Sequence, residues 1–228
     1  MGRTVVFFDL FFTLIEPVYG DSINENDVLN ISIKEWEAIA EDRELYFRRA
    51  TGKIRDPHEI IDEIIAKGGF NASLAKKSQL LELRMNKMRS ALCNVDRIIL
   101  NTLSRLKEME LKLCIISNAD TIDKTSWNES PLYPLFDSVI FSCDVGYIKP
   151  HPAIYQAAMG KMGVIPQNSY FVGDGGSDEL FGAKATGMRT VLSEHLVKRD
   201  NQELTKLLSY SDYHVRDFSE LLLIPFNK

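Results

Sequence analysis

Short, continuous runs of apolar residues recur along the chain and are separated by segments long enough to form helices. Five runs are rich in β-branched and aromatic residues, and a weaker sixth run follows them: residues 4–8, 112–116, 138–141, 169–172, 189–192 and 213–215. Continuous rather than alternating apolar character is typical of strands that are covered on both faces. Strands that alternate with helices predict a doubly wound parallel sheet of the α/β class, with right-handed crossovers.

One long interval, from residue 13 to about residue 91, breaks this alternation because it has helical periodicity and no candidate strand. A first amphipathic stretch begins at Ile33. A second starts near Pro57 and stops at Gly68, and a third begins at Leu74. Proline near the start of a helix and glycine after its end are common boundary signals. The interval therefore predicts a small unit made only of helices.

The helical interval divides the chain into two predicted domains. We expect a helical cap domain over residues 17–91, inserted into an α/β core domain formed by residues 1–16 and 92–228. The hinges between them are expected near residues 15–20 and 90–95. A length of 228 residues is enough for one core domain and a smaller insert.

Composition and charge narrow the class of protein. The chain is 45% hydrophobic and 26% charged, as in globular proteins with a sizeable core, and its net charge of -5 gives no reason to expect nucleic acid as a partner. No apolar run approaches the roughly 20 residues of a membrane-spanning helix, and no signal peptide is visible. The three scattered cysteines favour a reducing compartment. We expect a cytoplasmic protein, a monomer or a homodimer.

Polar residues stand at the ends of the predicted strands. Asp9, Ser117 and Asp174 each follow a strand directly, and Lys149 follows the third strand after a short loop. In an open parallel sheet, ligands bind outside the carboxyl ends of the strands. We therefore expect these four side chains to converge on one cleft.

The residue types in this cleft suggest phosphoryl chemistry. A carboxylate such as Asp9 can act as a nucleophile and form a covalent intermediate. Asp174 and Asp178, four residues apart in a glycine-rich loop, offer the hard oxygen ligands that suit Mg²⁺. The metal would screen the nucleophile from an anionic substrate, and Lys149 would add a fixed positive charge.

Short polar side chains could hold the phosphoryl oxygens. Ser117 and Asn118 offer hydrogen-bond donors directly after the second strand, and Thr13 could do likewise near Asp9. Glu179, next to Asp178, is expected to support the ligands from behind or to stand at a helix N-terminus, rather than to be a ligand itself. The four histidines show no metal-ligand spacing, so a zinc site is not expected.

At these residues the chain resembles the haloacid dehalogenase (HAD) superfamily, whose members are mostly phosphatases. The family has four motifs: Asp-x-Asp-x-Thr, a Ser or Thr after the second strand, a Lys, and Gly-Asp-x-x-x-Asp. The matching residues, in order, are Asp9 and Thr13, Ser117, Lys149, and Gly173, Asp174 and Asp178. Their order and placement agree over nearly the whole chain, and the helical interval resembles the family's cap between the first two motifs.

The resemblance implies a Rossmann-type core and a Mg²⁺-dependent hydrolase, most simply a phosphatase of a small phosphorylated metabolite. Asp9 would form the aspartyl-phosphate intermediate. The metal would be held by Asp9, Asp174, Asp178 and the backbone carbonyl of Phe11, which the family uses at that position.

Phe11 is also the one departure from the family pattern. The phosphatases carry a second Asp there as general acid and base, and phenylalanine cannot transfer a proton. General acid–base catalysis typically contributes about 10²–10⁴-fold. A phosphatase without this group would be slow on poor leaving groups unless water, the substrate or another residue transfers the proton.

This departure leaves three alternatives open. Haloacid dehalogenases have an aromatic Tyr at this position but lack the metal-binding acidic pair, so C–halogen hydrolysis fits less well. Phosphonatases lack the second Asp, keep magnesium and use a cap lysine as a Schiff base, a role for which Lys53 is the candidate. The third alternative is a regulatory protein that binds phosphate but catalyses weakly.

Overall fold

The computed structural model describes residues 4–19 and 23–226, and its centre is a six-stranded sheet. All neighbouring strands are parallel, in the order β3-β2-β1-β4-β5-β6. The strands are β1 (Val5–Phe8), β2 (Lys112–Ser117), β3 (Ser138–Phe141), β4 (Ser169–Gly173), β5 (Arg189–Ser193) and β6 (Tyr213–Val215). The six predicted runs are thereby confirmed, as is the doubly wound α/β class.

Helices fill the segments between the strands. Before β2 the chain forms α1 (Glu25–Leu29), α2 (Ile33–Ala40), α3 (Arg43–Ala50), α4 (Pro57–Lys67), α5 (Leu74–Cys93) and α6 (Arg97–Glu108). The later α-helices are α7 (Ser142–Val145), α8 (Pro152–Met162), α9 (Glu179–Ala185) and α10 (Asn201–Ser209). Short 3₁₀ turns are η1 (Trp127–Glu129), η2 (Tyr133–Leu135), η3 (Pro166–Asn168), η4 (Gly176–Asp178) and η5 (Phe218–Leu223). No helix of the described residues has the length and apolarity that crossing a membrane requires.

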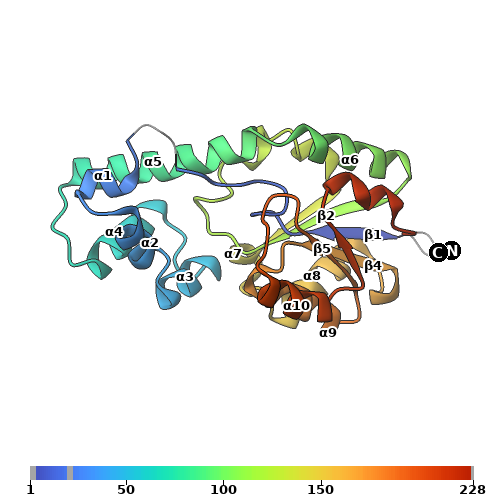
Figure 1. The fold of residues 1–228 in the computed structure, drawn as a ribbon. Helices are drawn as coiled ribbons and strands as arrows, with labels where there is room; N and C mark the ends of the chain where they lie inside the picture. Colours follow the sequence, from blue (N-terminus) through green and yellow to red (C-terminus); the bar gives the residue numbers. More distant parts are fainter. Residues whose placement is uncertain (1–3, 20–22, 227–228) are drawn as a thin grey trace.

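The central strand, β1, is buried on both faces. Val6 and Phe8 pack in a cluster with α6 and η5 on one side of the sheet. Val5 and Phe7 pack with α8, α9 and α10 on the other side (Figure 1). All four side chains are fully buried, which explains why the run is continuously apolar. Because β1 lies between β2 and β4, the residue that follows it stands at the middle of the sheet edge.

Helices α1 to α5 form what we call the five-helix region (residues 25–93), which lies at one end of the sheet (Figure 1). The region has an apolar cluster of its own around Trp36, Ile60, Ile64 and Leu80. The long helix α5 leads back to the core, where α6 follows it. Residues 1–3 of the predicted core and residues 20–22 near the first predicted hinge lie outside the described residues.

Candidate active site

Asp9 directly follows β1 and is held in place by the loop after it. The Asp9 N–H donates to the Val172 carbonyl at 2.9 Å, which continues the β1–β4 pairing by one residue. The chain then turns, with the Leu14 N–H donating to the Leu10 carbonyl at 2.9 Å, and this turn returns Thr13 to Asp9. The Thr13 hydroxyl donates to Asp9 Oδ2 at 3.0 Å. Asp9 is only 5% exposed, so its carboxylate has a fixed orientation.

Lys149 lies beside Asp9, although the two are far apart in sequence. Its Nζ donates to Asp9 Oδ1 and, at 2.5 Å, to Glu179 Oε2. Asn118 clamps the lysine backbone, because its Oδ1 accepts from the Lys149 N–H at 2.7 Å and its Nδ2 donates to the Lys149 carbonyl at 3.3 Å. The ammonium group is therefore fixed between two buried carboxylates.

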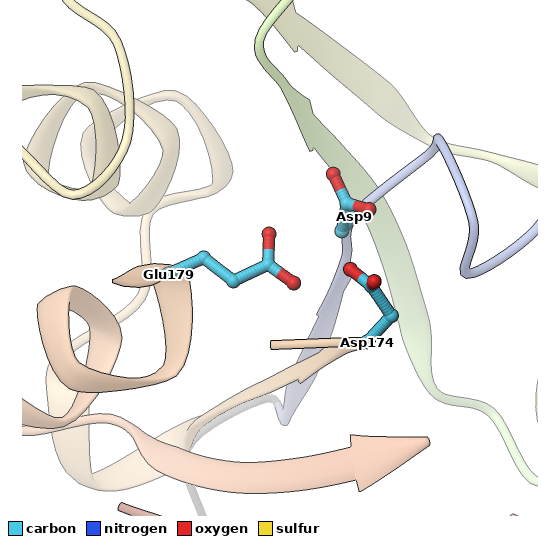
Figure 2. Close-up of side chains that lie close together, drawn as sticks. All are labelled: Asp9, Asp174 and Glu179. Carbon is cyan, nitrogen blue, oxygen red and sulfur yellow. The ribbon is translucent and has the colours of Figure 1, made fainter. Parts of the chain in front are cut away.

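Three carboxylates meet at this edge of the sheet. One oxygen each from Asp9, Asp174 and Glu179 lies within 4.8 Å of the others, and Figure 2 shows the side chains pointing toward one another. Asp174 is tied to the first loop, because its N–H donates to the Thr13 hydroxyl at 3.0 Å. Clustered carboxylate oxygens are the ligands that Mg²⁺ prefers, so the donor set fits this metal.

Glycine is required at position 173 for Glu179 to enter the cluster. A β-carbon on Gly173 would lie 2.1 Å from Glu179 Oε1, closer than any real contact. The same Oε1 accepts the Gly175 N–H at 3.2 Å. Glu179 is the first residue of α9, so the helix N-terminus also favours its negative charge.

Burial and neighbouring charges shift the pKa values of Asp9, Glu179 and Lys149. Burial raises the pKa of Asp9, the negative charge of Asp174 adds to this, and Lys149 only partly offsets it. Burial, with the charge of Asp9, raises the pKa of Glu179 well above its usual range. Burial alone would lower the pKa of Lys149, but Asp9 and Glu179 outweigh it and hold the pKa above its usual value. The site thus has a protonated lysine and a surplus of negative charge.

A cavity of about 620 Å³ opens above these groups. Asp9, Lys149 and Asp174 line it from the sheet edge, and Tyr46 and Arg84 line it from the five-helix region. Its lining also includes Phe11 and Asn118. A cavity of this size accommodates a small metabolite.

Other residues that the sequence singled out lie elsewhere. Asp178 is exposed and outside the carboxylate cluster, with its Oδ1 accepting from Lys206 Nζ at 3.0 Å. Lys53 is exposed too, with its Nζ 4.9 Å from the centre of the Phe47 ring, and it does not line the cavity. Ser117 is fully buried at the end of β2, and its hydroxyl donates to the Asn118 carbonyl at 3.5 Å. Thr13, Asn118 and Lys149 do gather around Asp9.

Two residues of the site were not assigned to it from the sequence. Glu179 was expected behind the ligands or at a helix N-terminus, yet its side chain joins the cluster. Arg199 lines the cavity, and its Nη2 donates to Asp174 Oδ2 and, at 3.2 Å, to the Asp174 carbonyl. It belongs to the loop after β5, which ends at Ser193 on the same edge of the sheet. The strand-end rule that located Asp9 would therefore have found this loop as well.

The chain matches the family model of haloacid dehalogenase-like hydrolases over residues 4–186. It belongs to this family, so the resemblance carried by the four motifs is confirmed.

Several curated relatives at about one third identity are phosphatases by name. A glyceraldehyde 3-phosphate phosphatase from Methanocaldococcus jannaschii is 32% identical over 131 residues, which cover 56% of this chain and 55% of the relative. A phosphoglycolate phosphatase from Mannheimia succiniciproducens is 31% identical over 137 residues, 58% of this chain and 59% of the relative. The chain spans little more than half the length of these curated relatives.

Solved structures share the fold over almost the full chain. A 2-haloacid dehalogenase from Pseudomonas syringae pv. Tomato superposes with a TM-score of 0.69 at 18% identity, covering 97% of each chain. A HAD family enzyme from Bacteroides thetaiotaomicron, in complex with magnesium and inorganic phosphate, gives 0.67 at 19% identity, covering 89% of this chain and 99% of that one. At these identities the likeness shows the fold alone.

Proposed function

We propose that the protein is a Mg²⁺-dependent phosphatase of a small phosphorylated metabolite, acting through an aspartyl-phosphate intermediate on Asp9. The observation that carries this proposal is the buried ammonium of Lys149 between Asp9 and Glu179, with Asp174 beside them. A nucleophilic carboxylate next to fixed positive charge is what attack on an anionic phosphate ester needs. The names of the curated relatives support a phosphatase.

Asp9, Asp174 and Glu179 would hold the metal, with the backbone carbonyl of Phe11 as a further candidate ligand. This set differs from the one expected from the motifs, because Glu179 takes the place of Asp178. Bound Mg²⁺ would neutralise the carboxylates and stabilise charge on the transferred group. Opposite charge favours the ionised form of a carboxylic acid, so metal binding would also lower the raised pKa of Asp9.

The side chains around Asp9 have separate roles in this proposal. Thr13 orients the carboxylate through its hydrogen bond to Oδ2. Oδ1 attacks phosphorus, the bond to the ester oxygen breaks, and Lys149 with the amide of Asn118 stabilises the phosphoryl oxygens. Water then attacks the aspartyl phosphate, which releases inorganic phosphate and restores Asp9. The leaving oxygen takes a proton from water or another group, since Phe11 has none to give.

The five-helix region would act as a cap. Tyr46, Arg84 and Lys87 from this region line the cavity opposite Asp9. In-line attack directs the leaving group away from the nucleophile and therefore toward these residues. A cap at this place would exclude water during phosphoryl transfer and contact the leaving group, which determines substrate choice.

The direct test is phosphate release from p-nitrophenyl phosphate with and without Mg²⁺. We expect turnover only with the metal and none in Asp9→Asn. Asp144→Asn, which changes a half-exposed carboxylate paired with Lys124, is the matched control and should keep wild-type turnover. Wild-type rates in Asp9→Asn would rule out the aspartyl-phosphate mechanism.

Phe11 motivates two further candidate functions, because this aromatic side chain lines the cavity where a proton donor would be expected. Release of halide from 2-haloacids without added Mg²⁺ would favour C–halogen hydrolysis. Tight binding of Mg²⁺ and phosphate without turnover of a broad panel of esters would favour a regulatory phosphate-binding protein.

The phosphonatase alternative depends on a cap lysine that can reach the substrate. Lys53 is exposed and stacks over Phe47 instead of lining the cavity. Borohydride trapping of a phosphonate substrate on Lys53 would be needed to support it.

A further inference from the structure

The cations on the cap side of the cavity are already neutralised by carboxylates. Arg49 is 1% exposed, and its Nε donates to Asp120 Oδ2 at 2.9 Å. Its other two nitrogens donate to the Ala40 carbonyl and to Glu41 Oε2, both at 2.5 Å. The guanidinium thus joins the five-helix region to the loop after β2, and each of its three nitrogens donates one hydrogen bond.

Arg84, from α5, is surrounded by acids. Its Nη2 lies 3.5 Å from Glu41 Oε1 and 3.7 Å from both Asp120 Oδ2 and Asp123 Oδ1. The Nε is without a hydrogen-bond partner, but it is sealed from solvent, so a ligand in the cavity does not reach it. The guanidinium is therefore surrounded by three carboxylates, of which Asp120 and Asp123 are buried and Glu41 is exposed.

Lys87, one turn further along α5, is also engaged. Its Nζ lies 2.9 Å from Glu25 Oε1 and 4.2 Å from the centre of the Tyr19 ring. Glu25 is 1% exposed, so the lysine neutralises a buried acid. Each of the three basic side chains on the described part of the cap side is therefore paired with at least one carboxylate.

Acids outnumber bases around the cap side of the cavity, which we call the wall, once the buried acids behind it are included. Glu37, Glu41 and Asp123 line the cavity together with Arg49, Arg84 and Lys87. Two further buried acids, Asp120 and Glu25, do not line it but pair with Arg49 and Lys87. Glu37 and Glu41 are exposed and line the cavity.

The titration of neighbouring groups is consistent with this surplus. Burial and the charge of Asp120 raise the pKa of Asp123 to about 6. Burial, with Glu25 and Glu37 contributing, raises the pKa of Tyr19. The cations that would contact the phosphoryl group, Lys149 and Arg199, lie at the opposite, catalytic end of the cavity.

We infer that the group esterified to phosphate is neutral or positively charged and does not carry a second anion. The inference rests on the proposed phosphatase function and specifies its substrate class. A carboxylate in the cap half of the cavity would meet like charge, which costs energy at short range. A cation would meet the carboxylates of Glu37 and Glu41, which line the cavity.

This inference separates the two kinds of phosphatase among the curated relatives. Glyceraldehyde 3-phosphate is uncharged beyond its phosphate, whereas phosphoglycolate adds a carboxylate at the position where the wall is acidic. The charge balance favours the first kind of substrate for this chain.

A two-carbon series that differs only in charge tests the inference. The esters are 2-hydroxyethyl phosphate, 2-aminoethyl phosphate and phosphoglycolate, and kcat/KM would be measured for each with Mg²⁺. We expect the neutral and cationic esters to exceed phosphoglycolate by at least about tenfold, a modest effect for like charges at close range. Equal or higher kcat/KM for phosphoglycolate would overturn the inference.

A variant that removes one charge tests whether the acidic wall causes the preference against phosphoglycolate. Glu37→Gln removes an exposed carboxylate of the cavity and should reduce the preference against phosphoglycolate by roughly threefold. Glu63→Gln is the matched control, because Glu63 pairs with Arg48 in the same region and does not line this cavity. An unchanged ratio in Glu37→Gln, or an equal change in the control, would contradict the assignment to this wall.

Binding measurements separate this inference from the phosphatase proposal. Calorimetric titration of the three esters into Asp9→Asn with Mg²⁺ gives their order of affinity without turnover. A wild type that releases no phosphate would contradict the proposed function alone. The binding order would still decide the charge preference: phosphoglycolate bound most tightly would overturn it.

Discussion

Arg199 places a guanidinium against a carboxylate that we propose as a metal ligand: its Nη2 donates to Asp174 Oδ2 and, at 3.2 Å, to the Asp174 carbonyl. A guanidinium and a divalent cation compete for the same oxygen. We therefore expect Arg199→Ala to bind Mg²⁺ at least roughly tenfold more tightly, because a nearby positive charge is removed. The same variant should bind inorganic phosphate more weakly. Isothermal titration with each ligand measures both effects.

Lys206→Ala is the control for Arg199, because it removes a cation that pairs with the exposed Asp178. We expect no change in Mg²⁺ affinity in this variant. Weaker or unchanged Mg²⁺ binding in Arg199→Ala would show that the arginine does not compete with the metal.

Glu179 and Asp178 are adjacent, yet only Glu179 points into the carboxylate cluster. We expect Glu179→Gln to weaken Mg²⁺ binding by about 10- to 100-fold, as losses at metal sites commonly do. Asp178→Asn should leave the affinity nearly unchanged because its side chain is exposed. A large loss in Asp178→Asn would restore the ligand set expected from the motifs.

Phe11 occupies the position where the family's phosphatases carry a general acid and base. Phe11→Asp should raise kcat for an alkyl phosphate, with about 10²–10⁴-fold as the ceiling for such a group. Hydrolysis of p-nitrophenyl phosphate should change little in its first step, because that leaving group needs no proton. The ratio of the two rates is the measurement, and Phe11→Asn is the control without an ionisable group. If Phe11→Asp and Phe11→Asn change the ratio of the two rates equally, proton transfer is excluded as the cause.

The raised pKa of Asp123 predicts a pH-dependent stability. Burial, with the charge of Asp120, raises it from the ordinary value near 4 to about 6. The folded state then binds the proton more tightly, so this contribution to stability is present below about pH 4 and lost as the pH rises through about 6. As the pH rises over this range, the free energy of unfolding of Asp123→Asn should increase relative to that of wild type by on the order of 3 kcal/mol.

Urea unfolding of wild type and Asp123→Asn at pH 4, 5, 6 and 7 measures that difference. Asp144→Asn serves as the control, because the Asp144 side chain is 44% exposed, and its difference from wild type should stay flat. If the difference in free energy of unfolding between Asp123→Asn and wild type does not rise with pH, the raised pKa of Asp123 is contradicted.

Two features of the sequence predict much of the fold and part of the site. They are the pattern of apolar strands and the polar residues at the carboxyl ends of those strands. Fully buried strands produce continuous apolar runs, and parallel strands bring their carboxyl ends to one edge. These two regularities are sufficient to predict that Asp9, Lys149 and Asp174 lie together. The five-helix region follows from periodicity alone, since helices that pack on each other keep an apolar stripe.

The local turn after β4 could not be predicted from residue types. Ser177 and Asp178 both adopt left-handed backbone conformations, with φ of 54° and 50°. Left-handed residues change the direction of the chain, and the spacing of residues in the sequence does not predict this change. As a result the carboxylate that enters the site is Glu179, five residues after Asp174, and the one four residues after it faces solvent. The position of Arg199 depends equally on the path of a loop.

The central position of β1 has a consequence for biosynthesis. Val5 comes long before its sheet partners in the chain, which are Lys112 on one side and Ser169 on the other. Contacts this distant in sequence form slowly, and chains fold as they are synthesised from the N-terminus. Asp9 therefore stays apart from Asp174 until β4 has emerged from the ribosome. Translation products that stop before β4 would carry an exposed apolar strand and no assembled carboxylate cluster.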